Sequence, residues 1–248
     1  MKKIWSFCIS LELCLGLLAL ICIVMAGGSF LLQGDYAAAI NSVALFVWLR
    51  EVPFAASWWL WLTVALLVLL VLNTILCSSE TLWSRWGRAG WMALLSPQLI
   101  HAGFLLMVLA HLMSAYGGSM QQLQVGEGMI AQLPDGRQFG VAGIEAVMSP
   151  MGMPLGISSE LVPNLHNPQE RCTISPNHPW FSGGYGVYIK QAEAYPYKRA
   201  LLEIHHEPGA GMALAGALIF TLGNVLLVWL RSRAKESRLE EGGNEVVS

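Results

Sequence analysis

The stretch WWLWLTVALLVLLVLNTILC, residues 58–77, contains no charged side chain. As a helix, about 20 residues rise about 30 Å, which matches the hydrocarbon core of a bilayer. Trp58, Trp59 and Trp61 at its start suit the aromatic belt at a membrane surface. We therefore expect a transmembrane helix over about 55–77.

Three more apolar runs, at about 4–32, 99–116 and 208–231, are long enough to span a bilayer. Of the 248 residues 55% are hydrophobic and only 12% are charged, whereas about a quarter of a soluble protein is charged. The first run is too long for the core of a signal peptide, so we expect it to be retained as a helix. The predicted fold class is a membrane protein, with a four-helix transmembrane bundle and a small β-rich extracytoplasmic domain between helices three and four.

Basic residues gather beside the predicted helix ends, at Lys2, Lys3, Arg85, Arg88, Arg231, Arg233, Lys235 and Arg238. Because basic residues concentrate in cytoplasmic loops, we expect both termini in the cytoplasm and residues 117–207 on the other side. The predicted location is the bacterial inner (cytoplasmic) membrane, with this domain in the periplasm or outside the cell. The tail, residues 232–248, is rich in Glu, Gly and Ser and is predicted to be cytoplasmic and disordered.

Residues 117–207 change to short runs in which apolar and polar side chains alternate, as in strands. Asp135 and Gly136 form a predicted hairpin turn between MIAQL and QFGVAGIEAV. A second strand pair is expected around GYGVYIKQAEAYPYKRALLEI. A domain of about 90 residues buries a modest core, so we expect this one to lean on the helix ends or on a partner.

Charge and cysteine spacing exclude several classes of function. The formal net charge of −2 argues against a nucleic-acid partner. No CxxC, CxxCH or paired zinc spacing occurs, nor any Walker loop, HExxH motif or Ser-His-Asp order, so no catalytic residue is assigned. Cys172 is the only cysteine of the polar region, and an inert thiol is favoured over a reactive one.

Two histidines, His101 and His111, lie in the third apolar run, where a polar side chain is costly and usually has a task. Ten residues along a helix correspond to a rise of about 15 Å and a net rotation of about −80°. The pair therefore cannot bind one metal ion and instead suits two depths in the membrane. Each could be a haem ligand if another helix or chain supplied the opposing ligand. From spacing alone, a hydrogen bond between helices is favoured for both.

Four other histidines are weaker candidates. His205 and His206 are expected at the membrane surface just before the fourth helix, where solvation at the interface explains them better than ligation. His166 and His178 are interpreted as ordinary loop histidines.

Several motifs occur in a familiar order. They are SLELCLGLLAL in the first helix, Asn73 and Cys77 as an Asn-x-x-x-Cys end to the second, and LIHAGFLLMVLAHL in the third. ISPNHPWFSGGYGVYIKQAEAY then contains Asn-x-Pro and Gly-Tyr-x-x-Tyr, and HHEPGAGMALAGALIFTLG opens the last helix. Together they resemble the ResB family, also called CcsB, of the System II cytochrome c biogenesis pathway, over nearly the whole chain.

The resemblance implies a function and partners. Members of the family act with a CcsA (ResC) partner, carry haem across the membrane, keep it reduced and present it for covalent attachment to apocytochrome c. The chain would then be a non-catalytic or co-catalytic subunit of a haem lyase complex, with transient haem b shared with the partner and thiol-reducing proteins nearby. His101 matches the family's inner haem ligand, whereas His111 has no secure counterpart.

The chain departs from the family in two ways. Its outer domain is shorter than usual, so it resembles a minimal member. The partner's tryptophan-rich haem motif and outer histidine pair are missing, so the chain is not expected to attach haem alone.

Two other functions stay open. One is a haem b-containing membrane subunit that moves electrons between quinol and an outer redox protein, with His101 and His111 as ligands at two depths. The other is a structural subunit without a cofactor.

Overall fold

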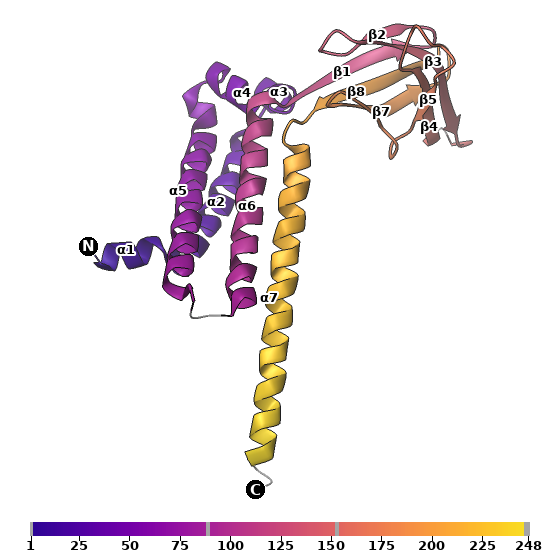
Figure 1. Ribbon diagram of the computed structural model, residues 1–248. Coiled ribbons are helices and arrows are strands. Elements are labelled where there is room, and N and C mark those ends of the chain that lie inside the picture. The colour runs from indigo at the N-terminus through magenta and orange to yellow at the C-terminus, as the bar shows by residue number, and fades with distance from the viewer. Residues whose placement is uncertain (1, 88–89, 152–153, 246–248) are drawn as a thin grey trace. The chain divides into compact units, whose positions relative to one another are not determined.

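The computed structural model describes residues 2–87, 90–151 and 154–245 (Figure 1). The helices are α1 (Lys2–Cys8), α2 (Leu11–Leu31), α3 (Asp35–Ala39), α4 (Leu45–Glu51), α5 (Phe54–Arg85), α6 (Trp91–Gly117) and α7 (Ala210–Glu245). The strands all lie between α6 and α7 in the sequence, as β1 (Ser119–Gly126), β2 (Ile130–Gln132), β3 (Gln138–Met148), β4 (Pro154–Val162), β5 (Cys172–Ile174), β6 (Trp180–Ser182), β7 (Tyr185–Glu193) and β8 (Arg199–His206).

The chain forms two compact units. The helical unit contains Met1–Ala37, Leu49–Met113 and Gly209–Ser248, and the β unit contains Ala38–Trp48 and Ser114–Pro208. Within the described part of the chain, four helices are long and apolar enough to cross a membrane: Leu11–Leu31, Phe54–Arg85, Trp91–Gly117 and Ala210–Lys235. The prediction of four such helices and a sheet-rich region is confirmed.

The first apolar run is broken, although a continuous helix over about 4–32 was expected. α1 ends at Cys8, and Ser10 caps α2 because its Oγ accepts a hydrogen bond from the Leu13 amide at 3.1 Å. The carbonyl of Cys8 accepts a hydrogen bond of 2.7 Å from Nδ2 of Asn73 on α5. A serine cap and an interhelical amide thus satisfy backbone groups that a break inside an apolar segment would leave without partners.

The second and third helices extend beyond the apolar runs that predict them. α5 continues past Cys77 to Arg85, and hydroxyl groups in this extension donate to carbonyls one turn earlier, as Thr81 does to Cys77 at 2.8 Å. α6 begins at Trp91 and holds Pro97 inside the helix. Arg88, one of the basic residues used to predict orientation, lies outside the described residues.

The C-terminal segment also differs from expectation. Residues 232–245, expected to be disordered, continue α7 without a break. Ala, Lys, Arg, Leu and Glu dominate this segment, and these residues have high intrinsic helix propensity.

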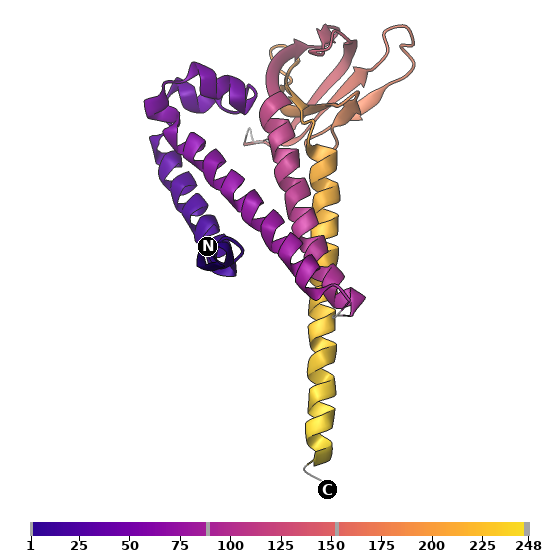
Figure 2. The same cartoon turned by 60° about the vertical axis from the view of Figure 1, so that its left-hand side comes forward.

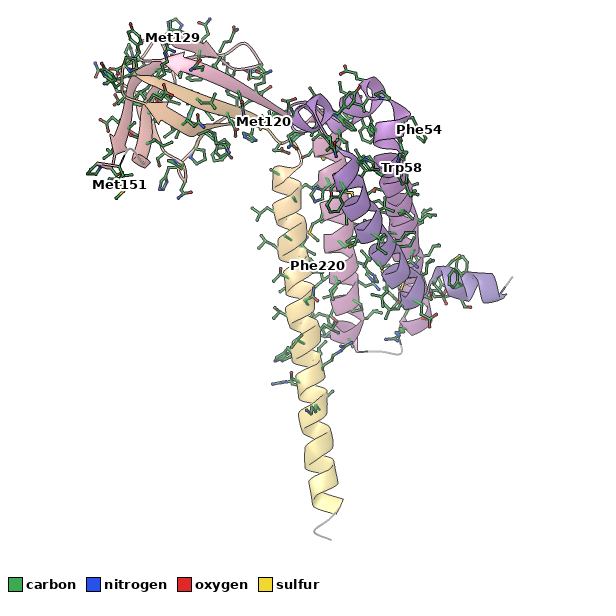
Figure 3. The ribbon with its side chains drawn as sticks, turned by 180° about the vertical axis from the view of Figure 1, so that it is seen from behind. Phe54, Trp58, Met120, Met129, Met151 and Phe220 are labelled. Atoms are coloured by element: carbon green, nitrogen blue, oxygen red, sulfur yellow. The ribbon has the colours of Figure 1, made fainter. Side chains whose placement is uncertain are left out.

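α6 and α7 lie side by side, with glycines where they touch (Figures 1 and 2). A Cβ atom on Gly103 would lie 2.5 Å from the backbone nitrogen of Phe220, which Figure 3 labels on α7, and 2.7 Å from the carbonyl oxygen of Gly216. A Cβ atom on Gly223 would lie 2.8 Å from the backbone nitrogen of Ile100. Small residues of this kind let helices in a bilayer approach until their backbones are in contact.

The β unit contains two antiparallel sheets of four strands, ordered β1-β8-β7-β6 and β2-β3-β4-β5. The expected hairpin is present, because β2 pairs with β3 and Gly136 has a φ of 91° in the turn between them. Both sheets contribute to one core, whose most buried large side chains include Phe139, Leu161 and Leu202, each 0% exposed. The alternation seen in the sequence thus reflects two sheets that share one apolar interior.

Because α6 and α7 are in close contact at Gly103, a methyl group added there should lower the free energy of unfolding more than the same group added at Gly27. Gly103→Ala forces a Cβ atom against backbone, so we expect it to lower the free energy of unfolding by about 1–3 kcal/mol. Gly27→Ala is the matched control, since a Cβ atom there would meet nothing within 4 Å. Thermal unfolding of the full chain in detergent measures both, and equal stability of the two variants would contradict the close packing.

Candidate functional site

His101 lies on the same face of α6 as Gln98 and Phe104, which contact residues of α2 and α5. Three residues before it, Gln98 shares two hydrogen bonds with Ser78 of α5, one through each side-chain amide atom. Three residues after it, Phe104 packs against the cluster of Leu17, Leu66 and Leu70 from α2 and α5. Residues three apart share one face of a helix, so His101 shares the face of these two neighbours, away from the Gly103 contact with α7.

The His101 ring has an unmet hydrogen-bonding need. Among the described residues, only two buried side-chain polar atoms lack a hydrogen-bond partner, Nδ1 of His101 and Oγ of Ser96. A buried polar atom without a partner costs about 1–3 kcal/mol. A group from a second chain that forms a hydrogen bond with Nδ1 would offset that cost.

His111 does not join this site. It lies ten residues later on α6 and is exposed, and the helix turns its side chain about 80° away from that of His101. The two histidines therefore occupy separate places on one helix. His111 as a haem ligand stays a prediction.

His205 and His206 end β8 and point to opposite faces of the sheet. His206 donates from Nδ1 to the carbonyl of Gly184 at 3.0 Å and stacks on Tyr185, with 4.7 Å between ring centroids. His205 donates from Nε2 to Glu203 at 3.1 Å and meets Tyr188 edge to face. Both rings thus have partners inside the β unit, and a role for either in haem binding stays a prediction.

Glu203 lies at the centre of a hydrogen-bond network on the outer face of the sheet β1-β8-β7-β6. It was not identified from the sequence. Its side chain is only 9% exposed, yet it bonds to three groups at 3.1 Å each, the side chains of Gln122, Lys190 and His205. Burial raises the pKa of this carboxyl, but the hydrogen bonds from His205, Lys190 and Gln122 outweigh that effect and hold the pKa below its usual value. A charged residue inside the apolar run RALLEIHH was the signal that could have revealed it.

Cys172 lies in β5 and is half-buried. Burial raises the pKa of its thiol, and the charge of Glu170 raises it further. Less thiolate is then present at neutral pH, which agrees with an inert thiol.

No metal centre is built by these side chains alone. In the described part of the chain, no three residues of the types His, Cys, Asp and Glu come together to hold a metal ion. An imidazole that binds iron through Nε2 keeps its proton on Nδ1. His101 could therefore offer one ligand through Nε2, but an acceptor for its Nδ1 proton and a second ligand for the iron would both have to come from outside the described residues.

Glu203→Gln should destabilise the β unit by about 1–3 kcal/mol at neutral pH, because charged hydrogen bonds are lost from a buried position. The pKa of Glu203 is lower in the folded state, so its stabilisation is present above the unfolded pKa of about 4.3 and is lost as the pH falls through the folded value. The difference between wild type and variant should therefore shrink in acid. Near-UV circular dichroism during denaturation at neutral and acidic pH measures it.

The matched control is Glu127→Gln, which removes an exposed ion pair of 2.8 Å with Lys198. We expect this change to cost less than about 1 kcal/mol. Equal effects of the two substitutions at neutral pH would show that the Glu203 network contributes nothing special.

Three chains of solved structures match this chain. A solved structure titled "Cytochrome c Heme Lyase CcmF" aligns with 16% sequence identity and a TM-score of 0.44. The alignment covers 86% of this chain and 34% of that chain, so this chain spans about a third of its length. No family model and no curated protein matches. A similarity this low assigns neither a family nor a function to the chain.

Proposed function

We propose that the chain is a cytochrome c maturation factor, which acts with a CcsA/ResC-type partner to carry haem across the membrane and present it to apocytochrome c. One observation carries the proposal. His101 lies in a helix able to span a membrane, inside a motif that resembles the histidine-bearing helix of the ResB family, and its buried Nδ1 has no partner within the described residues.

In this proposal, His101 would supply one ligand to haem b, and a partner chain would supply another. When bound, haem would supply an iron centre to which an imidazole nitrogen can bind. His101 would hold the group within the membrane, and apolar residues on the same helix face, such as Phe104, would help to exclude water. A partner helix would supply a second ligand, which agrees with transient binding shared by two chains.

The basic residues beside the helix ends orient the chain in this proposal. Both termini face the cytoplasm of a bacterium, and the β unit faces the periplasm or the exterior. His101 then lies nearer the cytoplasm, where haem enters. The β unit lies on the side where apocytochrome c receives it.

The substitution His101→Ala tests this role. In the complex purified with its partner, we expect b-type haem absorbance and the yield of mature cytochrome c to fall at least about tenfold. His101→Gly with added imidazole should recover part of the haem absorbance, because free imidazole can replace the missing ligand. A purely structural histidine would not be rescued in this way.

The control is His111→Ala, which should retain haem and cytochrome c maturation. Normal maturation in the His101→Ala variant would contradict the proposal. Stoichiometric haem in the isolated chain, lost in part with each histidine and without effect on cytochrome c, would instead indicate the electron-transfer subunit.

A further inference from the structure

β5 and β6 are shorter than β4 and β7, the strands beside which they pair, so part of one edge of β4 and of β7 has no paired strand within the described residues. β5 pairs with β4 only at Ser159, Glu160 and Leu161, and β6 pairs with β7 only from Tyr185 to Val187. Within the described residues, the remaining halves of these edges, 155–158 of β4 and 188–193 of β7, pair with no strand on that side. Each therefore presents unpaired backbone N–H and C=O groups.

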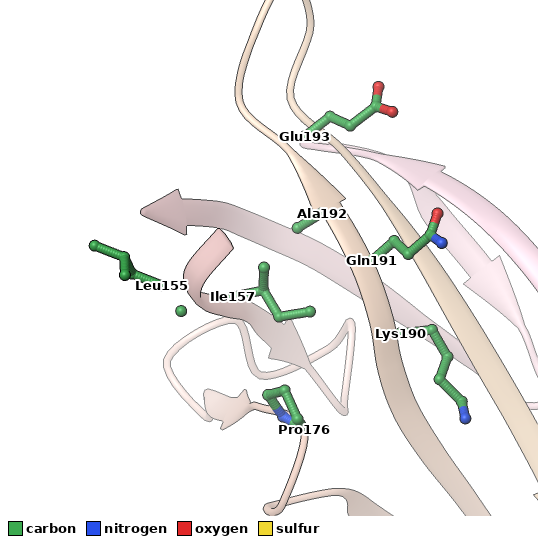
Figure 4. Close-up of a pocket in the computed structure, with 8 residues that line it drawn as sticks. Leu155, Ile157, Pro176, Lys190, Gln191, Ala192 and Glu193 are labelled. Atoms are coloured by element: carbon green, nitrogen blue, oxygen red, sulfur yellow. The ribbon is translucent and has the colours of Figure 1, made fainter. Parts of the chain in front are cut away.

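The two free edges line one pocket of about 480 Å³ (Figure 4). Its apolar lining comes from Leu155, Ile157, Pro176 and Ala192. Gly156 and the polar residues Lys190, Gln191 and Glu193 complete it. Pro176 belongs to the connection between β5 and β6, so residues from β4, β7 and this connection surround the pocket.

Several details leave these edges accessible. A Cβ atom on Gly156 would meet nothing within 4 Å among the described residues, so the space beside this position is open there. Lysine often protects a free edge, and Lys190 lines this pocket while its Nζ lies 3.1 Å from a carboxylate oxygen of Glu203. The volume falls in the range of ligand pockets, and an unpaired strand edge is complementary to extended backbone more than to a compact small molecule.

We infer that this pocket binds an extended segment of an unfolded polypeptide, which adds as a strand to the free edge of β7 or β4 and places an apolar side chain between them. Backbone hydrogen bonds supply the affinity in this mode, and the apolar lining selects the side chain. The inference rests on the proposed function only for the identity of the occupant, which would be a segment of apocytochrome c.

The test uses a fluorescent peptide of about ten residues in which Val and Thr alternate around a reduced Cys-x-x-Cys-His segment. Fluorescence anisotropy with the full chain in nanodiscs should show saturable binding. Gly156→Trp fills the pocket and should weaken binding at least about tenfold. Thr173→Trp is the matched control, an exposed strand position outside the pocket, and should leave binding unchanged.

A second peptide with N-methyl groups on alternate residues keeps the side chains but removes backbone donors. It should bind at least about tenfold more weakly. Hydrogen exchange of the wild-type chain checks the location without any variant, because the unmodified peptide should slow exchange within 155–158 and 188–193. Absence of binding, equal binding of both peptides or protection elsewhere would overturn strand addition.

The outcomes separate this inference from the proposed function. Peptide binding with protection of these edges, in a chain that holds no haem with its partner, would leave the inference standing and remove the haem role. Haem loss in the His101→Ala variant, without peptide binding to wild type, would do the reverse.

Discussion

A bilayer interior offers no water to bond with polar groups, and most details of the helical unit follow from that constraint. Where the first apolar run breaks, Ser10 caps α2 and Asn73 bonds the carbonyl of Cys8. Ser78 and Gln98 satisfy each other between α5 and α6. Among the described residues, Nδ1 of His101 and Oγ of Ser96 are the buried side-chain polar atoms that lack a partner. The proposed site at His101 therefore needs a second chain, to accept a hydrogen bond from Nδ1 and to share the haem.

The β unit meets the same requirement with a different result. Its core is apolar and shared by two sheets, while its one strongly buried carboxylate, Glu203, is held by three partners. Its unmet hydrogen-bonding capacity lies instead along the edges of β4 and β7, where β5 and β6 are too short to cover them. One unit thus leaves a side-chain nitrogen open and the other leaves backbone open. We propose a haem shared with a partner chain for the first and an extended polypeptide for the second.

Prediction from sequence succeeded where a signal is repeated over many residues. Four long apolar runs and an alternating region correspond to four helices able to span a membrane and a sheet-rich region. Prediction was less accurate where a single residue determines the local structure, such as the end of a helix. The break at Ser10 was missed because the apolar average continues across it, and the helix over 232–245 was missed because polar composition was given more weight than helix propensity.

The sequence by itself determined the apolar spans, the strand alternation and the place of His101 in the third span, because these depend on side-chain type and local period. Only the tertiary structure decided that Gly103 brings two backbones into contact and that Glu203 binds Gln122, Lys190 and His205. It also decided that Nδ1 of His101 has no partner among residues 2–87, 90–151 and 154–245. The unpaired edges of β4 and β7 were likewise decided only by the tertiary structure. Each depends on which groups distant segments bring together or leave unpaired, and no local pattern in the chain encodes that.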